Sequence, residues 1–407
     1  MISGERFSVI YRLVGSEKEA IKKALDICLE QTVEFPEELV PRGMIRDHVV
    51  GRIESVTPIS DVSVRDGLCG RTGTEAGATA GVCAGTASAT EGSRPSCRVT
   101  ISYAVETTSG ELTQLLNVIF GNISIKPGIV VEEICLPESL LKSFRGPRFG
   151  RQGLRKLLGV PHRPLLFTAL KPMGLSAAEL AKMAYECALG GIDIIKDDHG
   201  LTNQVFAPYE ERVRLCAEAV AKANRETGFN AIYVPNVTAP YNQLFQRARF
   251  AKEVGAQGLM ISPALAGLDT MRELADDDSL ALPIFSHPAF QGSYVTSAEN
   301  GISHFALFGQ ITRLAGADGV VYPNFGGRFS FSREECRRIA EGTETPMGHI
   351  QPIFPCPGGG MSLEAIPDML QVYGRDVTFL IGGGLFRHGP NLVENCRYFR
   401  EMVEKMV

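Results

Sequence analysis

From residue 165 onward, short runs of β-branched, aliphatic and aromatic residues alternate with longer segments in which apolar residues recur every three or four positions. The runs predict buried strands, and the longer segments predict amphipathic helices. Eight strands are expected, at 165–171, 192–198, 231–237, 258–264, 282–288, 319–325, 351–356 and 377–383. Because parallel strands need helical crossovers, this α/β pattern predicts a closed (β/α)8 TIM barrel, with an open doubly wound sheet as the alternative.

The chain before the barrel has a different pattern, with fewer and more widely spaced apolar runs. It predicts an N-terminal α+β domain of ferredoxin-like character over residues 1–145, followed by the barrel domain over 146–407. Residues 65–97 are rich in Gly, Ala, Thr and Ser without periodicity, which predicts a flexible surface insertion. The expected strands and helices are at 6–14, 17–31, 97–105, 110–121 and 123–137.

Charge and composition narrow the classes of function. The 407 residues carry a formal net charge of -5, so the positive excess typical of nucleic-acid binding is missing. No apolar run approaches the roughly 20 residues that cross a bilayer, and the first residues lack the pattern of a signal peptide, so we expect a cytoplasmic protein without a membrane partner. The ten cysteines show no zinc-binding spacing and are expected to be mostly buried thiols. A small-molecule enzyme fits this composition best.

Polar residues gather at the predicted C-terminal ends of the barrel strands, the face on which barrel enzymes place their chemistry. Lys171 ends the first strand, and Lys196, Asp197, Asp198 and His199 end the second. His287, Asn324 and Arg328 follow in the same way from the fifth and sixth strands. A lysine on a closed barrel face loses hydration and becomes a candidate acid or base.

The alternatives for these residues are structural. Lys171 is either a proton carrier or the partner of a carboxylate such as Asp198. Strand alternation sends Lys196 and Asp198 to one side and Asp197 to the other, so Asp197 is expected to be structural. His287 is either a core histidine or a proton-transfer group.

Two glycine triplets, 358–360 and 382–384, follow the seventh and eighth strands. Backbone amides without side chains can approach phosphate oxygens closely, and the loops after these strands are the usual phosphate site of a barrel. We therefore expect Gly359, Gly360, Gly383 and Gly384 to bind a phosphate. Arg328 either closes over the same phosphate or is a surface arginine.

Two motifs point to a family. The segment LKPMGLS (170–176), followed by GGIDIIKDDH (190–199), resembles the barrel motifs of the ribulose-1,5-bisphosphate carboxylase (RuBisCO) large chain. The resemblance continues through EQTVE (30–34), GN (121–122) and the two glycine triplets. It implies the same architecture of an N-terminal α+β domain before a barrel.

The resemblance also implies roles. In that family the lysine at the position of Lys196 is carbamylated by CO2 and holds Mg²⁺ together with residues at Asp198 and at His199, where the family has a glutamate. Since imidazole suits softer ions, another divalent metal is the alternative to Mg²⁺. Lys171 and His287 match the family's proton-transferring residues, and Arg328 matches a lysine on the loop after the sixth strand. Glu30 and Asn122 match substrate-binding residues that complete the partner's site in a homodimer.

The departures from the family pattern fall at one phosphate site. Pro288, Val321 and Gly358 stand where the family has an arginine, a histidine and a serine, and the threonine and tryptophan near Glu30 are missing. A bisphosphate would lack charge-assisted donors commonly worth about 1.5–3 kcal/mol each. The chain therefore resembles the RuBisCO-like proteins, and carboxylation of ribulose bisphosphate is not expected.

The favoured function is a divalent-metal enzyme that stabilises an enediolate of a monophosphorylated sugar or sugar acid. We expect a lyase that decarboxylates or cleaves a β-keto sugar acid phosphate, of the 3-oxo-isoapionate 4-phosphate type. One alternative is an isomerase or enolase of a methylthio-ketose phosphate in methionine salvage. The other is a barrel without catalysis that binds a sugar phosphate.

Overall fold

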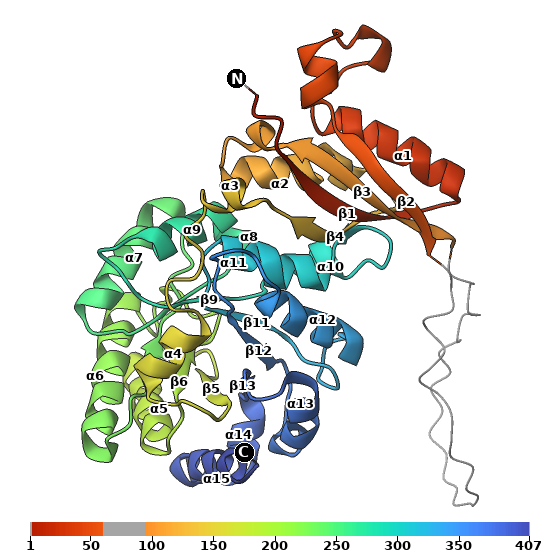
Figure 1. Cartoon of the computed structure of the whole chain (residues 1–407). Helices are drawn as coiled ribbons and strands as arrows, with labels where there is room; N and C mark the ends of the chain where they lie inside the picture. The colour runs from red at the N-terminus through yellow and green to blue at the C-terminus, as the bar shows by residue number, and fades with distance from the viewer. Residues whose placement is uncertain (1, 60–93, 407) are drawn as a thin grey trace, which may run out of the picture.

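The computed structural model describes residues 2–59 and 94–406, and its C-terminal part is a parallel barrel (Figure 1). One run of neighbouring strands has the order β13-β5-β6-β7 and the other β12-β11-β9-β8. A parallel bridge between Asn236 and Met260 joins the two runs on one side, and β12 lies beside β13 on the other. The strands are β5 (Leu165–Leu170), β6 (Ile194–Asp197), β7 (Ile232–Val234), β8 (Leu259–Ile261), β9 (Ile284–Ser286), β11 (Gly319–Pro323), β12 (Phe354–Gly358) and β13 (Thr378–Leu380). The predicted TIM barrel is confirmed.

The barrel interior is a packed core rather than a pore. Phe167, Phe285 and Phe354 from three strands lie in one fully buried cluster, which also contains Leu154 and Leu158. These two leucines belong to α4 (Gly150–Leu158), so this helix closes the N-terminal end of the barrel. The opposite end of the barrel, where the strands have their C-terminal ends, is the end at which barrel enzymes place their active-site residues.

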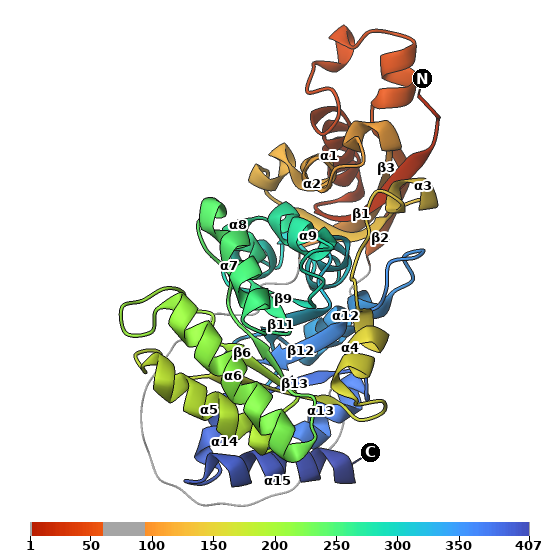
Figure 2. The ribbon, with the colours of Figure 1, turned by 90° about the vertical axis from the view of Figure 1, so that its left-hand side faces the viewer.

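Helices surround the barrel strands, and α5 and α6 lie side by side on its outside (Figure 2). Two of the helices begin at a capping box, Ser176 with Glu179 and Ser332 with Glu335, which fixes where the preceding loop ends. The helices after the strands are α5 (Ala177–Leu189), α6 (Tyr209–Thr227), α7 (Tyr241–Glu253), α9 (Leu268–Asp276), α12 (Arg333–Glu344), α13 (Ile366–Tyr373) and α15 (Leu392–Lys405). Shorter helices are α3 (Glu138–Leu141), α8 (Pro263–Ala266), α10 (Gly292–Val295), α11 (Thr312–Leu314) and α14 (Gly383–Arg387).

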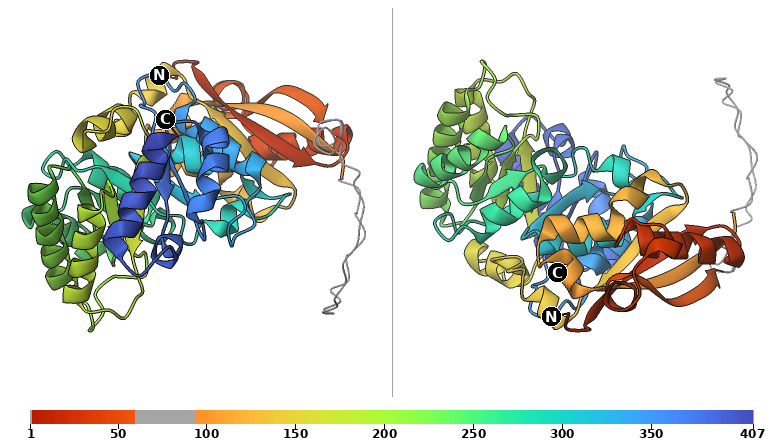
Figure 3. Two further views of the ribbon diagram at one scale, coloured as in Figure 1. Left: turned by 90° about the horizontal axis from the view of Figure 1, so that it is seen from below. Right: turned by 90° about the horizontal axis from the view of Figure 1, so that it is seen from above.

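The N-terminal part is a sheet that projects from one side of the barrel in both views of Figure 3. Its strand order is β10-β4-β1-β3-β2, and β1 is antiparallel to both β3 and β4. Alternate residues of β1 are buried, which is the pattern of a sheet covered on one face. The elements are β1 (Arg6–Val14), α1 (Glu17–Glu30), β2 (Arg52–Ile59), β3 (Ser96–Ala104), α2 (Leu112–Phe120) and β4 (Ile129–Cys135).

One strand of this sheet comes from the barrel half of the chain. The short β10 (Gly301–Ile302) pairs in parallel with β4, and the Gln310 side chain exchanges two hydrogen bonds with the backbone of Ile134, at 2.9 and 2.7 Å. Gln310 lies in η6 (Phe305–Ile311), a π-helical segment. The two halves of the chain are therefore joined by backbone pairing as well as by side-chain packing.

Three features differ from the sequence-based expectations or go beyond them. Strand β2 was not predicted, because its side chains are mostly exposed and give no apolar run. The helix expected after β9 is π-helical over most of its length, a geometry without a sequence signal of its own. Ser96 and Cys97 of the predicted insertion belong to β3, and residues 65–93 of it lie outside the described residues.

No helix in the described part of the chain has the length and apolar character of a membrane span.

Candidate active site

A cavity of about 890 Å³ lies at the C-terminal ends of the barrel strands. The barrel residues to which the sequence assigned a catalytic, metal-binding or phosphate-binding role all line it, although they are far apart in the sequence, whereas Asp197 and Asn324 at the same strand ends do not. They are Lys171, Lys196, Asp198, His199, His287, Arg328, Gly359, Gly360, Gly383 and Gly384. The structure thus brings one predicted set together, and the roles of its members stay predictions.

Lys196 and Asp198 form the buried floor of this cavity. Lys196 is only 2% exposed, and its ammonium donates to the backbone carbonyl of Asp197 at 2.9 Å. Burial lowers the pKa of Lys196 to about 8, although the charge of Asp198 opposes the shift. At pH 7 about a tenth of the buried amine is therefore uncharged, far more than for an exposed lysine, and this is the form that can react with CO2.

Lys171 and Asp198 form a close ion pair across the mouths of β5 and β6. Burial opposes ionisation of Asp198, but the bond from Lys171 and the backbone N–H of Gly200, at 2.9 Å, outweigh it and lower the pKa of Asp198. The carboxylate is therefore charged at neutral pH. The Lys171 side chain keeps about a third of its exposure, at 37%, so it still reaches the open cavity.

Asp197 points away from the cavity, as strand alternation predicted. It is fully buried, accepts a hydrogen bond from the Tyr233 hydroxyl at 2.7 Å and pairs with Arg212 Nε at 3.2 Å. Arg212 itself is held by the carbonyls of Ala207 and Thr202. These satisfied contacts give Asp197 a structural role at the junction of β6, β7 and α6.

The rings of His199 and His287 are stacked, with centroids 4.4 Å apart and planes 12° from parallel. Burial, reinforced by the nearby lysines, holds the pKa of His287 well below its usual range, and burial also lowers the pKa of His199. The backbone N–H of Ala289 donates to Nδ1 of His287 at 3.2 Å. The neutral His287 ring therefore carries its proton on Nε2 and can donate it towards a bound ligand.

The metal-ligand set predicted from the sequence fits only with a modified lysine. Nδ1 of His199 lies 3.4 Å from Oδ1 of Asp198, a spacing that suits two donors on one ion. Across the described ranges, however, no group of three or more His, Cys, Asp or Glu side chains is placed to hold a metal. A carbamate on Lys196 would supply the missing oxygen donor between them.

The glycine triplets form one end of the cavity. Gly359 and Gly360 have φ of +88° and +95°, values that side-chain-bearing residues rarely adopt. A Cβ on Gly383 would meet nothing within 4 Å, so its backbone faces open space. We call residues 324–332, between β11 and α12, the Arg328 loop; its Arg328 N–H donates to the Gly359 carbonyl at 3.1 Å. Arg328 thereby lies next to the glycine backbone.

Apolar side chains line the cavity next to the ends of β9 and β11. Pro288 and Val321 line it, together with Val295, Phe308 and Phe331. Because none of these side chains can pair with an anion, Pro288 and Val321 supply no charge-assisted donor for a second phosphate, and His287 and Arg328 are the ionisable lining residues that follow β9 and β11.

Several lining residues were not predicted from the sequence. Arg387, at the C-terminal end of α14, lines the cavity near the second glycine triplet, and in the described part of the chain it has no hydrogen bond or ion pair. Phe308 lies in η6, and Phe331 lies near the far end of the Arg328 loop. Only the folded arrangement reveals these residues, because no motif or spacing marks them.

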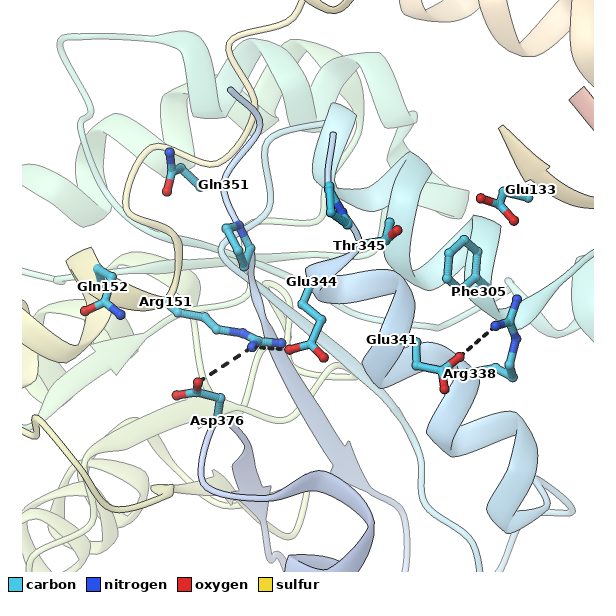
Figure 4. A pocket seen from close by; sticks show the side chains of 12 residues that line it. Glu133, Arg151, Gln152, Phe305, Arg338, Glu341, Glu344, Thr345, Gln351 and Asp376 are labelled. Carbon is cyan, nitrogen blue, oxygen red and sulfur yellow. Dashed lines mark hydrogen bonds and ion pairs between the residues drawn. The ribbon is translucent and has the colours of Figure 1, made fainter. Parts of the chain in front are cut away.

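A second cavity, of about 770 Å³, lies beside α4 and α12 (Figure 4). Most of its charged side chains are already paired: Arg151 bonds Glu344 at 2.7 Å, and Arg338 bonds Glu341 at 2.6 Å. Arg151 also donates to the Ile353 carbonyl, just before β12 begins. These contacts join neighbouring segments at the N-terminal end of the barrel. We therefore interpret this end of the barrel as structural.

Comparison with known proteins decides the family. The family profile for "Ribulose bisphosphate carboxylase large chain, catalytic domain" matches residues 150–406. The chain is 33% identical over 399 residues, 98% of each chain, to "Ribulose bisphosphate carboxylase-like protein 1" of Rhodopseudomonas palustris. This chain is a RuBisCO-like member of the ribulose bisphosphate carboxylase large-chain family.

Two further relatives give the RuBisCO-like chain a structural and a functional context. The crystal structure of a Rubisco-like protein from Rhodopseudomonas palustris matches with a TM-score of 0.80 at 32% identity, covering 98% of this chain and 97% of that one. The "5-methylthioribulose-1-phosphate isomerase" of Rhodospirillum rubrum is 34% identical over 396 residues, 97% of this chain and 95% of the relative.

The two N-terminal residues that the RuBisCO resemblance singled out do not line the cavity of their own chain. Asn122 donates to Oε1 of Glu30 at 3.1 Å, and Lys126 pairs with Oε2 of Glu30 at 2.9 Å. The bonds from Lys126 and Asn122 lower the pKa of Glu30. In this RuBisCO-like chain the pair is thus assembled at the surface of the N-terminal sheet, separate from the barrel residues of the same chain.

Proposed function

We propose that this protein is a metal-dependent isomerase that enolises a ketose carrying a single phosphate and an apolar substituent, of the 5-methylthioribulose 1-phosphate class. The observation that carries the proposal is the polarity of the cavity. The glycine backbone after β12 and β13 lines the cavity with Arg328 beside it, whereas Pro288 and Val321 add apolar lining after β9 and in β11. A substrate with one anionic end and one apolar end matches both sides.

The enolisation moves one proton between neighbouring carbons and leaves the composition of the substrate unchanged. Lys171, which lies beside Asp198 at the cavity and must be uncharged to act as the base, takes the proton from the carbon next to the carbonyl and returns it to the former carbonyl carbon. His287 donates its Nε2 proton to the former carbonyl oxygen and regains a proton from the neighbouring hydroxyl, which becomes the new carbonyl. The glycine amides and Arg328 hold the phosphate and so fix which carbon faces Lys171.

The proposal includes a divalent ion held by Asp198, His199 and a carbamate on Lys196. When bound, such an ion supplies positive charge that stabilises the enediolate. The neutral fraction of Lys196 and the adjacent donors on Asp198 and His199 support this set. Mg²⁺ fits an all-oxygen set best, so the imidazole favours a test with Mn²⁺ and Co²⁺ alongside Mg²⁺.

The proposal also includes a homodimer. Glu30 and Asn122 are hydrogen-bonded to each other but stand apart from the cavity of their own chain. In a dimer they would reach the cavity of the partner and cover its mouth.

The decisive experiment uses 5-methylthioribulose 1-phosphate in D2O with bicarbonate and each of the three metals, followed by proton and phosphorus NMR. We expect an isomeric phosphate that has gained deuterium, with no CO2 released. Lys171→Met is the control, and it should still bind the phosphate while losing exchange.

The same assay separates the alternatives. Decarboxylation of a β-keto sugar acid phosphate, the function favoured from the sequence, would release CO2 from that substrate and leave the ketose phosphate unchanged. That outcome would overturn the isomerase proposal. Binding without turnover of either compound would indicate a barrel that only holds sugar phosphates.

A further inference from the structure

We infer that Asn324 and Tyr373 form a latch that positions the Arg328 loop over the phosphate end of the cavity. In this inference Asn324 is a positioning residue, because it acts through the loop and does not line the cavity. It deepens the proposed function by naming what fixes Arg328, and it rests on that proposal only for the identity of the substrate.

Asn324 makes contacts through both polar atoms of its side chain and through its backbone N–H at the base of the loop. It is fully buried, and its Oδ1 accepts a hydrogen bond from the Tyr373 hydroxyl. Its Nδ2 donates to the Phe325 carbonyl at 2.9 Å and contacts the Met361 sulfur at 3.4 Å. Its backbone N–H donates to the Gly358 carbonyl at 2.8 Å. One amide side chain therefore ties the loop to the segment after β12 and to the end of α13.

The loop beyond Asn324 rests directly on the first glycine triplet. A Cβ on Gly327 would lie 2.5 Å from the Gly359 carbonyl, and a Cβ on Gly360 would lie 3.1 Å from the backbone N of Arg328. Backbone packs on backbone here with no room for a side chain. A shift of the loop base would therefore move Arg328 relative to the glycine amides that are proposed to bind the phosphate.

Neighbouring helices hold the other side of the latch. The Tyr373 ring lies 6.3 Å from the Phe325 ring, centroid to centroid, and Tyr373 is 9% exposed. Arg333 of α12 stacks over Phe325 at 4.5 Å and pairs with Asp368 of α13. Because these contacts do not need the Tyr373 hydroxyl, its removal should release the loop without unfolding α12 or α13.

Tyr373→Phe tests the latch in the full-length protein without any substrate. Arg328 is exposed, so trypsin can cut the Arg328–Phe329 bond when the loop opens. We expect Tyr373→Phe to speed cleavage after Arg328 by about threefold to tenfold, because this is the effect of one lost hydrogen bond on a local opening equilibrium. Mass spectrometry of the fragments measures the cleavage rate. Tyr209→Phe is the matched control, since it removes one buried hydroxyl that donates to the Arg247 carbonyl at 2.9 Å, far from the loop. Equal cleavage rates in the two variants would overturn the inference.

A double variant checks that both residues act through one bond. Cleavage of Asn324→Ala with Tyr373→Phe should be no faster than cleavage of Asn324→Ala alone, and multiplied effects would contradict the latch. With a phosphorylated substrate, Tyr373→Phe should raise KM more than it lowers kcat. Inorganic phosphate should slow the cleavage of the wild type after Arg328, and this tests the proposed phosphate site separately. If phosphate gives no protection, the difference in cleavage rate between Tyr373→Phe and Tyr209→Phe still supports the latch.

Discussion

Lys196 is a cationic side chain placed at the end of a barrel strand where water hardly reaches. Its charged form is disfavoured by burial, and its nearest hydrogen-bond partner is a backbone carbonyl rather than a carboxylate. Such a residue weakens the fold at neutral pH, and a reactive amine is the gain that offsets this cost.

Replacing Lys196 should therefore stabilise the protein while removing its activity. In CO2-free, metal-free buffer at pH 7, we expect Lys196→Met to raise the free energy of unfolding by about 1–3 kcal/mol, measured by urea denaturation. The folded-state pKa of about 8 lies below the unfolded value of 10.5, so the cost in the wild type is complete below pH 8. It is relieved as pH rises from 8 to 10.5, and the difference between the two proteins should shrink over that window.

Lys171→Met is the contrasting variant for this measurement. The Lys171 side chain is partly exposed and pairs with Asp198, so its loss leaves a mostly buried carboxylate without its partner. We expect Lys171→Met to destabilise the protein. A stabilisation by Lys171→Met, or none by Lys196→Met, would contradict the account of Lys196.

Arg328 is the second residue with a measurable individual effect. Loss of one charge-assisted contact to a phosphate commonly costs about 1.5–3 kcal/mol, so Arg328→Ala should raise KM for the phosphorylated substrate by about 10-fold to 100-fold. Steady-state kinetics on the NMR-identified substrate measures this. Arg214→Ala, which removes a surface arginine paired with Glu218 on α6, should leave KM unchanged. A similar rise in both variants would exclude a specific role for Arg328.

At the scale of elements, the second glycine triplet opens the short helix α14, and its members face different surroundings. A Cβ on Gly384 would lie 2.3 Å from the Met361 carbonyl, whereas a Cβ on Gly383 would meet nothing within 4 Å. One glycine is needed for packing between two loops, and the other leaves the backbone open to the cavity.

Alanine at Gly384 should therefore affect mainly the stability of the protein, whereas alanine at Gly383 should affect mainly substrate binding. Gly384→Ala should lower the free energy of unfolding by about 1–3 kcal/mol, because the loop after β12 must shift. Gly383→Ala should change stability by less than about 0.5 kcal/mol but raise KM, because a methyl group blocks the close approach of a phosphate. Parallel thermal unfolding and kinetics test the pair. A stable, fully active Gly384→Ala would show that the close contact is not needed.

The sequence predicted the barrel well because its strands are buried on both faces and read as continuous apolar runs, as in Leu165–Leu170. It failed for β2, whose pairing with β3 is long-range and whose side chains stay exposed. In the site, residues at strand ends such as Lys171 and His287 were found from position alone. Arg387 was not, because its place beside the cavity depends on how α14 folds back after β13.

At the scale of the whole molecule, the cavity of the barrel and the Glu30–Asn122 pair belong to one chain but do not meet in it. A homodimer in which each N-terminal sheet serves the other barrel would join them. Such a site depends on residues from two copies of the chain.

Complementation between two inactive variants tests the shared site. Glu30→Gln and Lys196→Met should each be inactive alone, but a mixed dimer would contain one site free of both changes. Co-expression with random pairing should restore about a quarter of the wild-type activity. Asn122→Ala with Glu30→Gln is the matched control, since both changes fall in the same N-terminal part of the chain and no mixed dimer gains an intact site. Absence of recovery in the first mixture would place each site within a single chain.

The pairing of β10 with β4 sets a rule for recombining this chain with its relatives. A chimera that exchanges the first 145 residues would keep Gly301–Ile302 and Gln310 from one parent and Ile134 from the other. The crossover at 145 thus cuts through a sheet, although it looks like a clean linker along the chain. A donor sequence would need to bring residues 301–310 with it, as a second inserted block, to keep the edge of its own sheet.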